Sequence, residues 1–181
     1  MNGKICDNAS VGVMIRRDRR WLFFERAAFP AGIAPCAGHV FDEHESYLDA
    51  ACAEVREELG LTVGALYSTG VGGWRPNRCR RDPGPQGTGH MWLVYTAEVS
   101  GDLQPSPRET RSVRWLEEQD MQALAGRTAA YARGEVSEPL FAAAPGIEPV
   151  WVAFLVELGL ISMRASTLAL IEQVAMTGSP A

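Results

Sequence analysis

The 181-residue sequence predicts an α/β fold, with helices packed on a mixed β-sheet and a helical extension at its C-terminal end. Two observations carry this prediction. Segments rich in β-branched and aromatic residues alternate with segments of helical periodicity, in the order β-β-β-α-β-β-β-α over about the first 125 residues. Hydrophobic residues make up 46% of the chain and charged residues 22%, the ordinary balance of a globular protein with a real core.

The first three strands come early in the chain. Val11–Arg16 and Trp21–Arg26 are rich in β-branched and aromatic residues, and the charged turn Arg17–Arg20 joins them. Ile33–Val40 is expected to form a short strand that runs through a glycine. These segments should pair in one sheet.

The clearest helix is Ser46–Leu59. Ser46 is suited to cap it, Asp49 follows three residues later as in a capping box, and Gly60 ends it. Apolar residues recur at helical spacing and are expected to form its buried stripe: Leu48, Ala51, Cys52, Val55 and Leu59.

The second half of the sheet follows this helix. Leu61–Val71 is expected to be a strand that leads into a surface loop, Gly72–Gly89, which is dense in Gly, Pro, Arg and Asn. Met91–Val99 and Ser112–Leu116 are the remaining expected strands, and a helix should run from about Glu118 to Leu124.

The pattern divides the chain into a domain of residues 1–127 and a helical extension of residues 128–181. Two helices with large apolar faces, about Glu148–Leu158 and Ser162–Ala175, are separated by Gly159. They either cover one side of the domain or form the contact of a homodimer.

Composition excludes several classes of function. The net charge of −5 argues against broad nucleic-acid binding through phosphate neutralisation. Met1–Ser10 lacks the apolar stretch of a signal peptide, and Val150–Ile161 is too short to span a bilayer, so no membrane association is expected. The cysteines show no close paired spacing, which favours reduced thiols in a cytoplasmic protein: Cys6, Cys36, Cys52 and Cys79.

Three glutamates share one face of the expected helix. Glu54, Glu57 and Glu58 are spaced i, i+3, i+4, and such like charges destabilise a helix by roughly 0.2–0.5 kcal/mol per pair. A solvated acidic face is one interpretation of this pattern. The other is a magnesium site, because magnesium prefers carboxylate oxygens and completes its shell with water and substrate phosphates.

Residues 38–61 resemble the Nudix box, the signature of the Nudix hydrolase family. That signature reads glycine, five residues, glutamate, seven residues, then Arg-Glu-hydrophobic-x-Glu-Glu-x-Gly-hydrophobic. Aligned on its C-terminal end, the match covers Glu45, Glu54, Val55, Glu57, Glu58, Gly60 and Leu61. Two departures stand out: six residues separate Gly38 from Glu45, and Ala53 occupies the place of an arginine that usually holds the neighbouring carboxylates.

The resemblance implies an α/β/α sandwich fold and metal-dependent hydrolysis of an acid anhydride, the diphosphate bond of a nucleoside diphosphate linked to another moiety. Mg²⁺, or Mn²⁺ in its place, would be held by Glu54, Glu57 and Glu58, with Glu45 in support from the loop. Glu57, Glu58 and Glu109 are the catalytic candidates, and Glu109 is the loop carboxylate considered as general base. ADP-ribose-like molecules and nucleoside triphosphates are both open as substrates. The alternative is an inactive domain that binds nucleotides or regulates, and Ala53 is the feature that favours it.

Positive charge is expected to meet the diphosphate. Arg26 matches a position where family members often carry a phosphate-binding arginine. In the loop 74–81, guanidinium groups suit phosphate oxygens and an indole suits a base, although a flexible basic loop without a ligand is the competing interpretation. The substrate-binding candidates are Arg26, Trp74, Arg75, Arg78, Arg80 and Arg81.

A zinc site was also considered from Cys36, His39, Cys79 and His90. The spacing from Cys79 to His90 is long, and Cys36 and His39 point in opposite directions on an expected strand. Packing cysteines and ordinary histidines are therefore the favoured interpretation.

Overall fold

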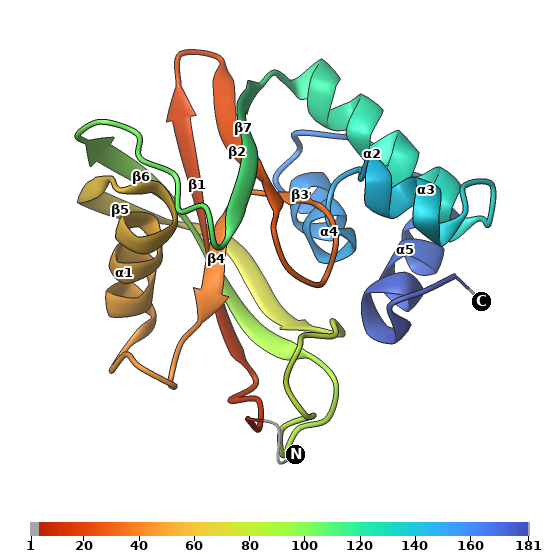
Figure 1. Ribbon diagram of the computed structural model, residues 1–181, viewed down its shortest axis with the longest axis horizontal. Coiled ribbons are helices and arrows are strands. Elements are labelled where there is room, and N and C mark those ends of the chain that lie inside the picture. Colours follow the sequence, from red (N-terminus) through yellow and green to blue (C-terminus); the bar gives the residue numbers. More distant parts are fainter. Residues whose placement is uncertain (1–3, 181) are drawn as a thin grey trace.

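Seven strands form one mixed sheet that lies between α1 and a group of C-terminal helices (Figure 1) in the computed structural model, which describes residues 4–180. The strand order is β3-β2-β1-β6-β5, with β4 paired to β1 and β7 paired to β2. The strands are β1 (Ala9–Arg17), β2 (Arg20–Arg26), β3 (Ile33–Ala34), β4 (Cys36–His39), β5 (Thr62–Arg75), β6 (His90–Ser100) and β7 (Thr110–Leu116). The helices are α1 (Tyr47–Leu59), α2 (Glu118–Ala132), α3 (Glu138–Ala143), α4 (Pro149–Glu157) and α5 (Ala165–Thr177). The expected α/β fold with a mixed sheet is confirmed.

Strand β1 organises the sheet because it pairs with three neighbours. It runs parallel to β6 and antiparallel to β4, and its C-terminal end pairs with β2. In this register Ser10 lies opposite His39 and Ala9 lies opposite Met91. The end of β4 and the start of β6 are therefore neighbours across β1, although His39 and His90 are far apart in the sequence.

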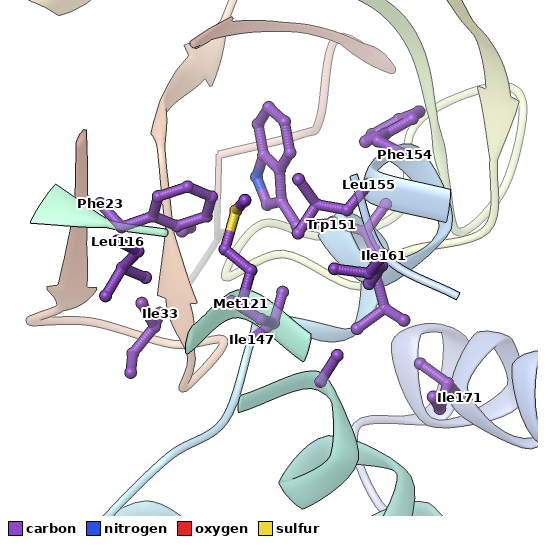
Figure 2. Packing of buried hydrophobic residues seen from close by; sticks show 14 of the residues in the cluster. Phe23, Ile33, Leu116, Met121, Ile147, Trp151, Phe154, Leu155, Ile161 and Ile171 are labelled. Atoms are coloured by element: carbon purple, nitrogen blue, oxygen red, sulfur yellow. The ribbon is translucent and has the colours of Figure 1, made fainter. Parts of the chain in front are cut away.

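Each face of the sheet carries its own hydrophobic cluster. The residues of β1 alternate between the two: Val11, Val13 and Ile15 belong to the cluster with α1, and Met14 belongs to the cluster with the C-terminal helices. The second cluster is the larger, and Figure 2 shows Trp151 at its centre. It includes Phe23, Ile33, Leu116, Met121, Ile147, Phe154, Leu155, Ile161 and Ile171.

The C-terminal helices pack on the sheet. Helix α4 buries every residue from Pro149 to Leu155, and β3 forms an isolated bridge from Ile33 to Ile147. This is the packing alternative considered from the sequence, while a homodimer stays a prediction. The division into residues 1–127 and 128–181 also stays a prediction, and α2 continues past residue 127. Residues 1–3 and 181, at the outer ends of the two expected parts, lie outside the described residues.

Two expectations about strands were wrong in detail. Strand β5 continues to Arg75 rather than ending before Gly72. At Gly72 a Cβ would stand 2.3 Å from the carbonyl oxygen of Trp92, so glycine here lets β5 shift register and stay paired to β6 instead of starting a loop. The expected strand Ile33–Val40 is two strands, because Pro35 interrupts it and offers no N–H to a partner.

The buried face of α1 was also misplaced. Leu48 is 53% exposed and Cys52 is exposed, whereas Ala53 and Glu58 are buried. The helix is turned so that its glutamate-bearing side faces β4, and small alanines rather than leucine make much of its contact. Among residues 4–180, none of the helices has the length and apolar character that membrane crossing requires.

Candidate active site

The helix α1 is fixed at both ends by the caps that the sequence predicted. The backbone N–H of Asp49 donates to Ser46 Oγ at 3.2 Å, and Gly60 ends the helix with φ of 70° while its N–H donates to the carbonyl of Arg56. Because both of its ends are fixed, α1 holds the glutamates of its C-terminal half in defined positions.

Five glutamates and three arginines line one cavity of about 230 Å³. The glutamates Glu54, Glu57 and Glu58 come from α1, and Glu109 comes from the loop before β7. The arginines are Arg26, Arg80 and Arg81. We call this cavity the acidic pocket. Asp42, Glu43 and His44, from the loop before α1, also line it.

The glycine of the signature makes room for the first of these carboxylates. A Cβ at Gly38 would stand 1.6 Å from Oε1 of Glu54, so any side chain at position 38 would collide with that carboxylate. Strand β4 therefore needs glycine at this point for Glu54 to lie against it.

Glu58 is the most deeply buried of the glutamates that line the acidic pocket. It is 5% exposed, and its Oε2 accepts a hydrogen bond of 3.1 Å from the backbone N–H of Ala37. This bond holds the carboxylate against β4, so Glu58 is fixed before any ligand arrives.

Burial and crowding raise the pKa values of two glutamates. The pKa of Glu54 rises to about 8, mainly by desolvation and then by repulsion from Glu58, Glu109 and Glu57. Desolvation raises the pKa of Glu58 to about 7, against the Ala37 hydrogen bond and other opposing contacts. Crowded carboxyl groups of this kind offer only hard oxygen donors, which fit Mg²⁺ or Mn²⁺.

Arg26 supplies positive charge where the signature arginine is missing. Position 53 carries a buried alanine, whereas Arg26, at the end of β2, lowers the pKa values of both Glu54 and Glu58. Its guanidinium lies 3.5 Å from the buried carboxylate of Glu148. An arginine of β2 therefore acts on the carboxylates that the signature arginine of the helix usually holds.

Arg81 is held in place by two carboxylates. Its Nη1 pairs with Asp42 and lies 3.8 Å from Asp7. Its neighbour Arg80 is exposed at the mouth of the acidic pocket. Arg81 is thus held by ion pairs, whereas Arg80 is exposed to solvent and to a ligand in the pocket.

The other candidates lie away from these residues. Glu45 is exposed in the loop before α1, outside the pocket lining. Trp74 packs near Gly89, and Arg75 pairs with Glu157 of α4. Arg78 lines adjoining cavities and donates from its Nη1 to the carbonyl oxygen of Thr177 at 3.2 Å.

Sequence reasoning grouped the cysteines and histidines incorrectly. Cys36 lies beside Glu58 and is fully buried there. The residue that joins His39, Cys79 and His90 is Cys6, and the four ligand atoms all lie within 4.8 Å of one another. Three of the four residues that the sequence offered for a zinc site therefore do lie together, while the expectation of packing cysteines and ordinary histidines stays a prediction. The pairing of β1 with both β4 and β6 was the missing signal, because it brings the two histidines together.

Comparison with known proteins agrees with this geometry. The NUDIX domain family matches residues 7–134. No curated protein matched the chain. Among solved structures, a MutT NUDIX hydrolase from Burkholderia pseudomallei is similar, with a TM-score of 0.51, 22% identity, and coverage of 62% of this chain and 84% of that one. The E. coli ORF135 protein has a TM-score of 0.49 and 22% identity over 68% of this chain and 79% of its own. The family match spans most of the chain, and the chain therefore belongs to the Nudix hydrolase family.

Proposed function

We propose that this protein is a metal-dependent pyrophosphohydrolase that cleaves the diphosphate bond of a nucleoside diphosphate linked to another moiety. The observation that supports this most is the acidic pocket, where five glutamates and three arginines line one cavity. Carboxylates suit divalent cations and guanidinium groups suit phosphate oxygens, so the pocket is complementary to a metal-bound diphosphate.

Glu54, Glu57 and Glu58 would hold Mg²⁺, with Mn²⁺ as a substitute. The bound ion would polarise phosphate oxygens and lower the pKa of a bound water molecule. Glu58 is buried and hydrogen-bonded to Ala37, and Glu54 lies against Gly38, so these two carboxylates are preorganised. Glu45 is still proposed to support the metal from the loop before α1, although it is exposed there.

The remaining residues act on the substrate and on the proton. Arg26, Arg80 and Arg81 neutralise diphosphate oxygens, which matters because phosphoryl transfer depends chiefly on charge stabilisation and positioning. Water attacks one phosphorus, the bond to the bridging oxygen breaks, and that oxygen leaves with the other phosphate. Glu109 is exposed at the pocket and is our candidate to accept the proton of the attacking water.

Both ADP-ribose-like molecules and nucleoside triphosphates fit this proposal. We assign substrate selection to the loop 74–81, because its residues 77–81 line a neighbouring cavity and two of them, Arg80 and Arg81, also line the acidic pocket. The four cysteines are free thiols, which supports the proposal of a reducing, cytoplasmic location.

A panel of diphosphate-linked nucleotides and triphosphates, incubated with and without Mg²⁺, tests the proposal. Product identification should show a nucleoside monophosphate and the phosphorylated remainder of the substrate. Both products should form only when metal is present. The Glu57→Gln variant should retain the fold and lose turnover. Failure of every compound to react, with parent and variant indistinguishable, would remove the hydrolase proposal.

Ala53 favours one second candidate, a nucleotide-binding module without turnover. Such a protein would use the same arginines and would be stabilised by ligand according to RT ln(1 + [L]/Kd). Thermal shifts with a nucleotide, measured beside product analysis of the same samples, separate the two. Stabilisation without any product would favour the binding module over the hydrolase.

A further inference from the structure

Four segments that are distant in the sequence bring two thiols and two imidazoles to one point. Cys6 precedes β1, His39 ends β4, Cys79 lies in the loop after β5, and His90 begins β6. Sγ of Cys6 lies 3.0 Å from Nε2 of His90 and 3.5 Å from Nε2 of His39, and all four ligand atoms fall within 4.8 Å of one another. We call these four residues the Cys2His2 cluster.

The two cysteines share one local geometry. The backbone N–H of Asn8 donates to Sγ of Cys6 at 3.3 Å, and the backbone N–H of Arg81 donates to Sγ of Cys79 at 3.4 Å. Each sulfur thus accepts an N–H from the residue two positions later. These two bonds hold each sulfur in position beside the histidines.

A buried amide fixes the tautomer of His90. Trp92 Nε1 can only donate, and it lies 3.1 Å from Oδ1 of Asn77, so this atom acts as an acceptor. The same oxygen lies 2.7 Å from Nδ1 of His90, which must therefore carry the proton. Nε2 of His90 is left with a free lone pair directed at Cys6. A polar partner that orients a histidine in this way is characteristic of metal ligands.

The carboxylate of Asp7 holds the chain at the end of β4. Asp7 accepts backbone N–H bonds from Val40 at 3.1 Å and from Phe41 at 2.8 Å through its Oδ2, so its carboxylate is occupied by the chain beside the cluster. This anchors the residues that follow His39.

The donor set selects the metal. Two thiolates and two neutral imidazoles form the Cys₂His₂ set of tetrahedral zinc sites. With zinc–sulfur bonds near 2.3 Å and zinc–nitrogen bonds near 2.0 Å, ligand atoms in such a tetrahedron are about 3.3–3.8 Å apart. The two distances from Sγ of Cys6 to the imidazoles, 3.0 Å and 3.5 Å, are close to this range, and all pairs of ligand atoms lie within 4.8 Å. Binding would release two thiol protons to solvent, and the resulting centre would be neutral, so its partial burial is not opposed by a net charge.

We propose that Cys6, His39, Cys79 and His90 bind one Zn²⁺ in a closed tetrahedral site. Four protein ligands leave no open position, so the site is structural rather than catalytic. It is also separate in kind from the acidic pocket, which offers oxygen donors from α1 and the loop before β7.

Zinc would fasten the loop between β5 and β6, residues 76–89, to the sheet, and we call this segment the basic loop. Cys79 directly precedes Arg80 and Arg81, which line the acidic pocket, and the isolated bridge from Ile5 to Asp82 already joins this loop to the N-terminal segment. Without the metal this loop would keep its other contacts but lose its link to both histidines. The consequence for substrate binding rests on the proposed function, whereas the zinc site itself does not.

The decisive experiment is metal analysis of the whole protein purified under reducing conditions. We expect about one zinc per chain by plasma mass spectrometry, released by a thiol-blocking mercurial reagent. After removal of zinc, Co²⁺ should give the visible bands of a tetrahedral ion and a thiolate-to-cobalt charge-transfer band. A preparation that binds neither Zn²⁺ nor Co²⁺ while its cysteines are reduced would overturn the proposal. A Cys6–Cys79 disulfide in the purified protein, in place of bound metal, would overturn it as well.

Variants locate the site. Cys6→Ser and Cys79→Ser should each lose the cobalt charge-transfer signal in part and lower the zinc content severalfold. Cys52→Ser is the matched control, because Cys52 is an exposed cysteine of α1 and should keep full zinc content. Equal zinc content in all three variants would contradict the assignment. Should Cys6→Ser not fold, the cobalt spectrum of the parent protein still decides the question.

The zinc proposal and the proposed function fail in different ways. Zinc content and the cobalt spectrum require no substrate, and Glu57→Gln should leave both unchanged. Hydrogen exchange adds a second readout, because removal of zinc should speed amide exchange in residues 76–89 and leave α1 protected. Unchanged exchange in that loop after complete zinc removal would overturn the anchoring role.

Discussion

The acidic pocket and the Cys2His2 cluster meet at the end of β4, yet they are built from opposite kinds of donor. Gly38 faces the carboxylate of Glu54, and the next residue, His39, belongs to the cluster. Oxygen donors on one side suit a hard cation that exchanges water and substrate, whereas sulfur and nitrogen donors on the other suit a cation held permanently.

The difference also concerns how each centre is assembled. Three of the five pocket glutamates lie on one capped helix, so helical spacing alone places them together. The four residues of the cluster come from four separate segments and meet only when the sheet forms. A local motif thus gives the centre that we assign to chemistry, and long-range topology gives the centre that we assign to stability.

The largest expected effect is on kcat and comes from a change in the acidic pocket. Glu57→Gln removes one carboxylate charge from the pocket and should lower kcat by about 100-fold or more, because this charge helps to hold the metal. Glu57 is exposed, so the free energy of unfolding should stay within about 0.5 kcal/mol of the parent. Steady-state kinetics and urea unfolding measure the two. A fully active variant would place the metal elsewhere.

The next effect separates the two centres. Asn77→Ala removes the acceptor that orients His90 and should lower zinc affinity about 10- to 100-fold, as loss of such partners does in other metal sites. Competition with a chelator of known affinity measures this change. Asn77→Asp keeps an oxygen acceptor and is the control that should retain most of the affinity. The Mg²⁺ concentration needed for half-maximal activity should not change, and a parallel change would mean that the centres are coupled.

A smaller effect is expected where the two centres share the basic loop. Arg80→Ala removes one guanidinium from the mouth of the acidic pocket and should raise KM by roughly tenfold, the worth of one charge-assisted hydrogen bond. Arg19→Ala, in the turn between β1 and β2, is the matched control and should leave KM unchanged. Zinc content should be the same in both variants. A lower kcat at constant KM would instead assign Arg80 to the transition state.

The last expected effect concerns stability rather than catalysis: a pH dependence that belongs to the carboxylates. The folded-state pKa values of Glu54 and Glu58, about 8 and about 7, lie above their unfolded values, so the folded chain binds more protons. Without added Mg²⁺ the free energy of unfolding should therefore fall as pH rises from about 6.5 to 8, by up to about 1.4 kcal/mol per pH unit for each group.

The histidines limit where this slope is visible. In protein freed of zinc, burial lowers the pKa values of His39 and His90 to about 4, so their contribution to stability rises with pH below the unfolded value of about 6.5. The two slopes oppose each other in acid and separate above pH 6.5. Glu54→Gln should flatten the upper slope in urea titrations at several pH values. An equally steep fall in that variant would assign the slope to other groups.

How far the sequence predicted this molecule depends on the range of the interactions. The caps Ser46 and Gly60 and the spacing of the three glutamates act within one helix, and they were read correctly. Placing Glu109 at the same pocket was a hypothesis about a loop, and the fold does bring it there. Sheet strands were found because their pattern is local, although Pro35 and Gly72 changed where they break.

What the sequence could not give was orientation and pairing. Periodicity indicated a buried stripe on α1 but did not show that its Glu58 side turns toward β4, which leaves Leu48 exposed. Cys36 and His39 were grouped by their short spacing, whereas Cys6 joins the cluster through the pairing of β1 with its neighbours. Only the register of the assembled sheet carries that information.

The attachment of the basic loop to α5 bears on how this protein could diverge from its relatives. The backbone N–H of Arg78 donates to the carbonyl of Ala175 at 2.7 Å, and Arg75 pairs with Glu157 of α4. The loop assigned to substrate selection is thus held by helices that contribute nothing to the acidic pocket. Selection acting on α4 and α5 can move this loop and leave Glu54 and Glu58 untouched. Substrate preference and hydrolytic power can then evolve as separate traits within one chain.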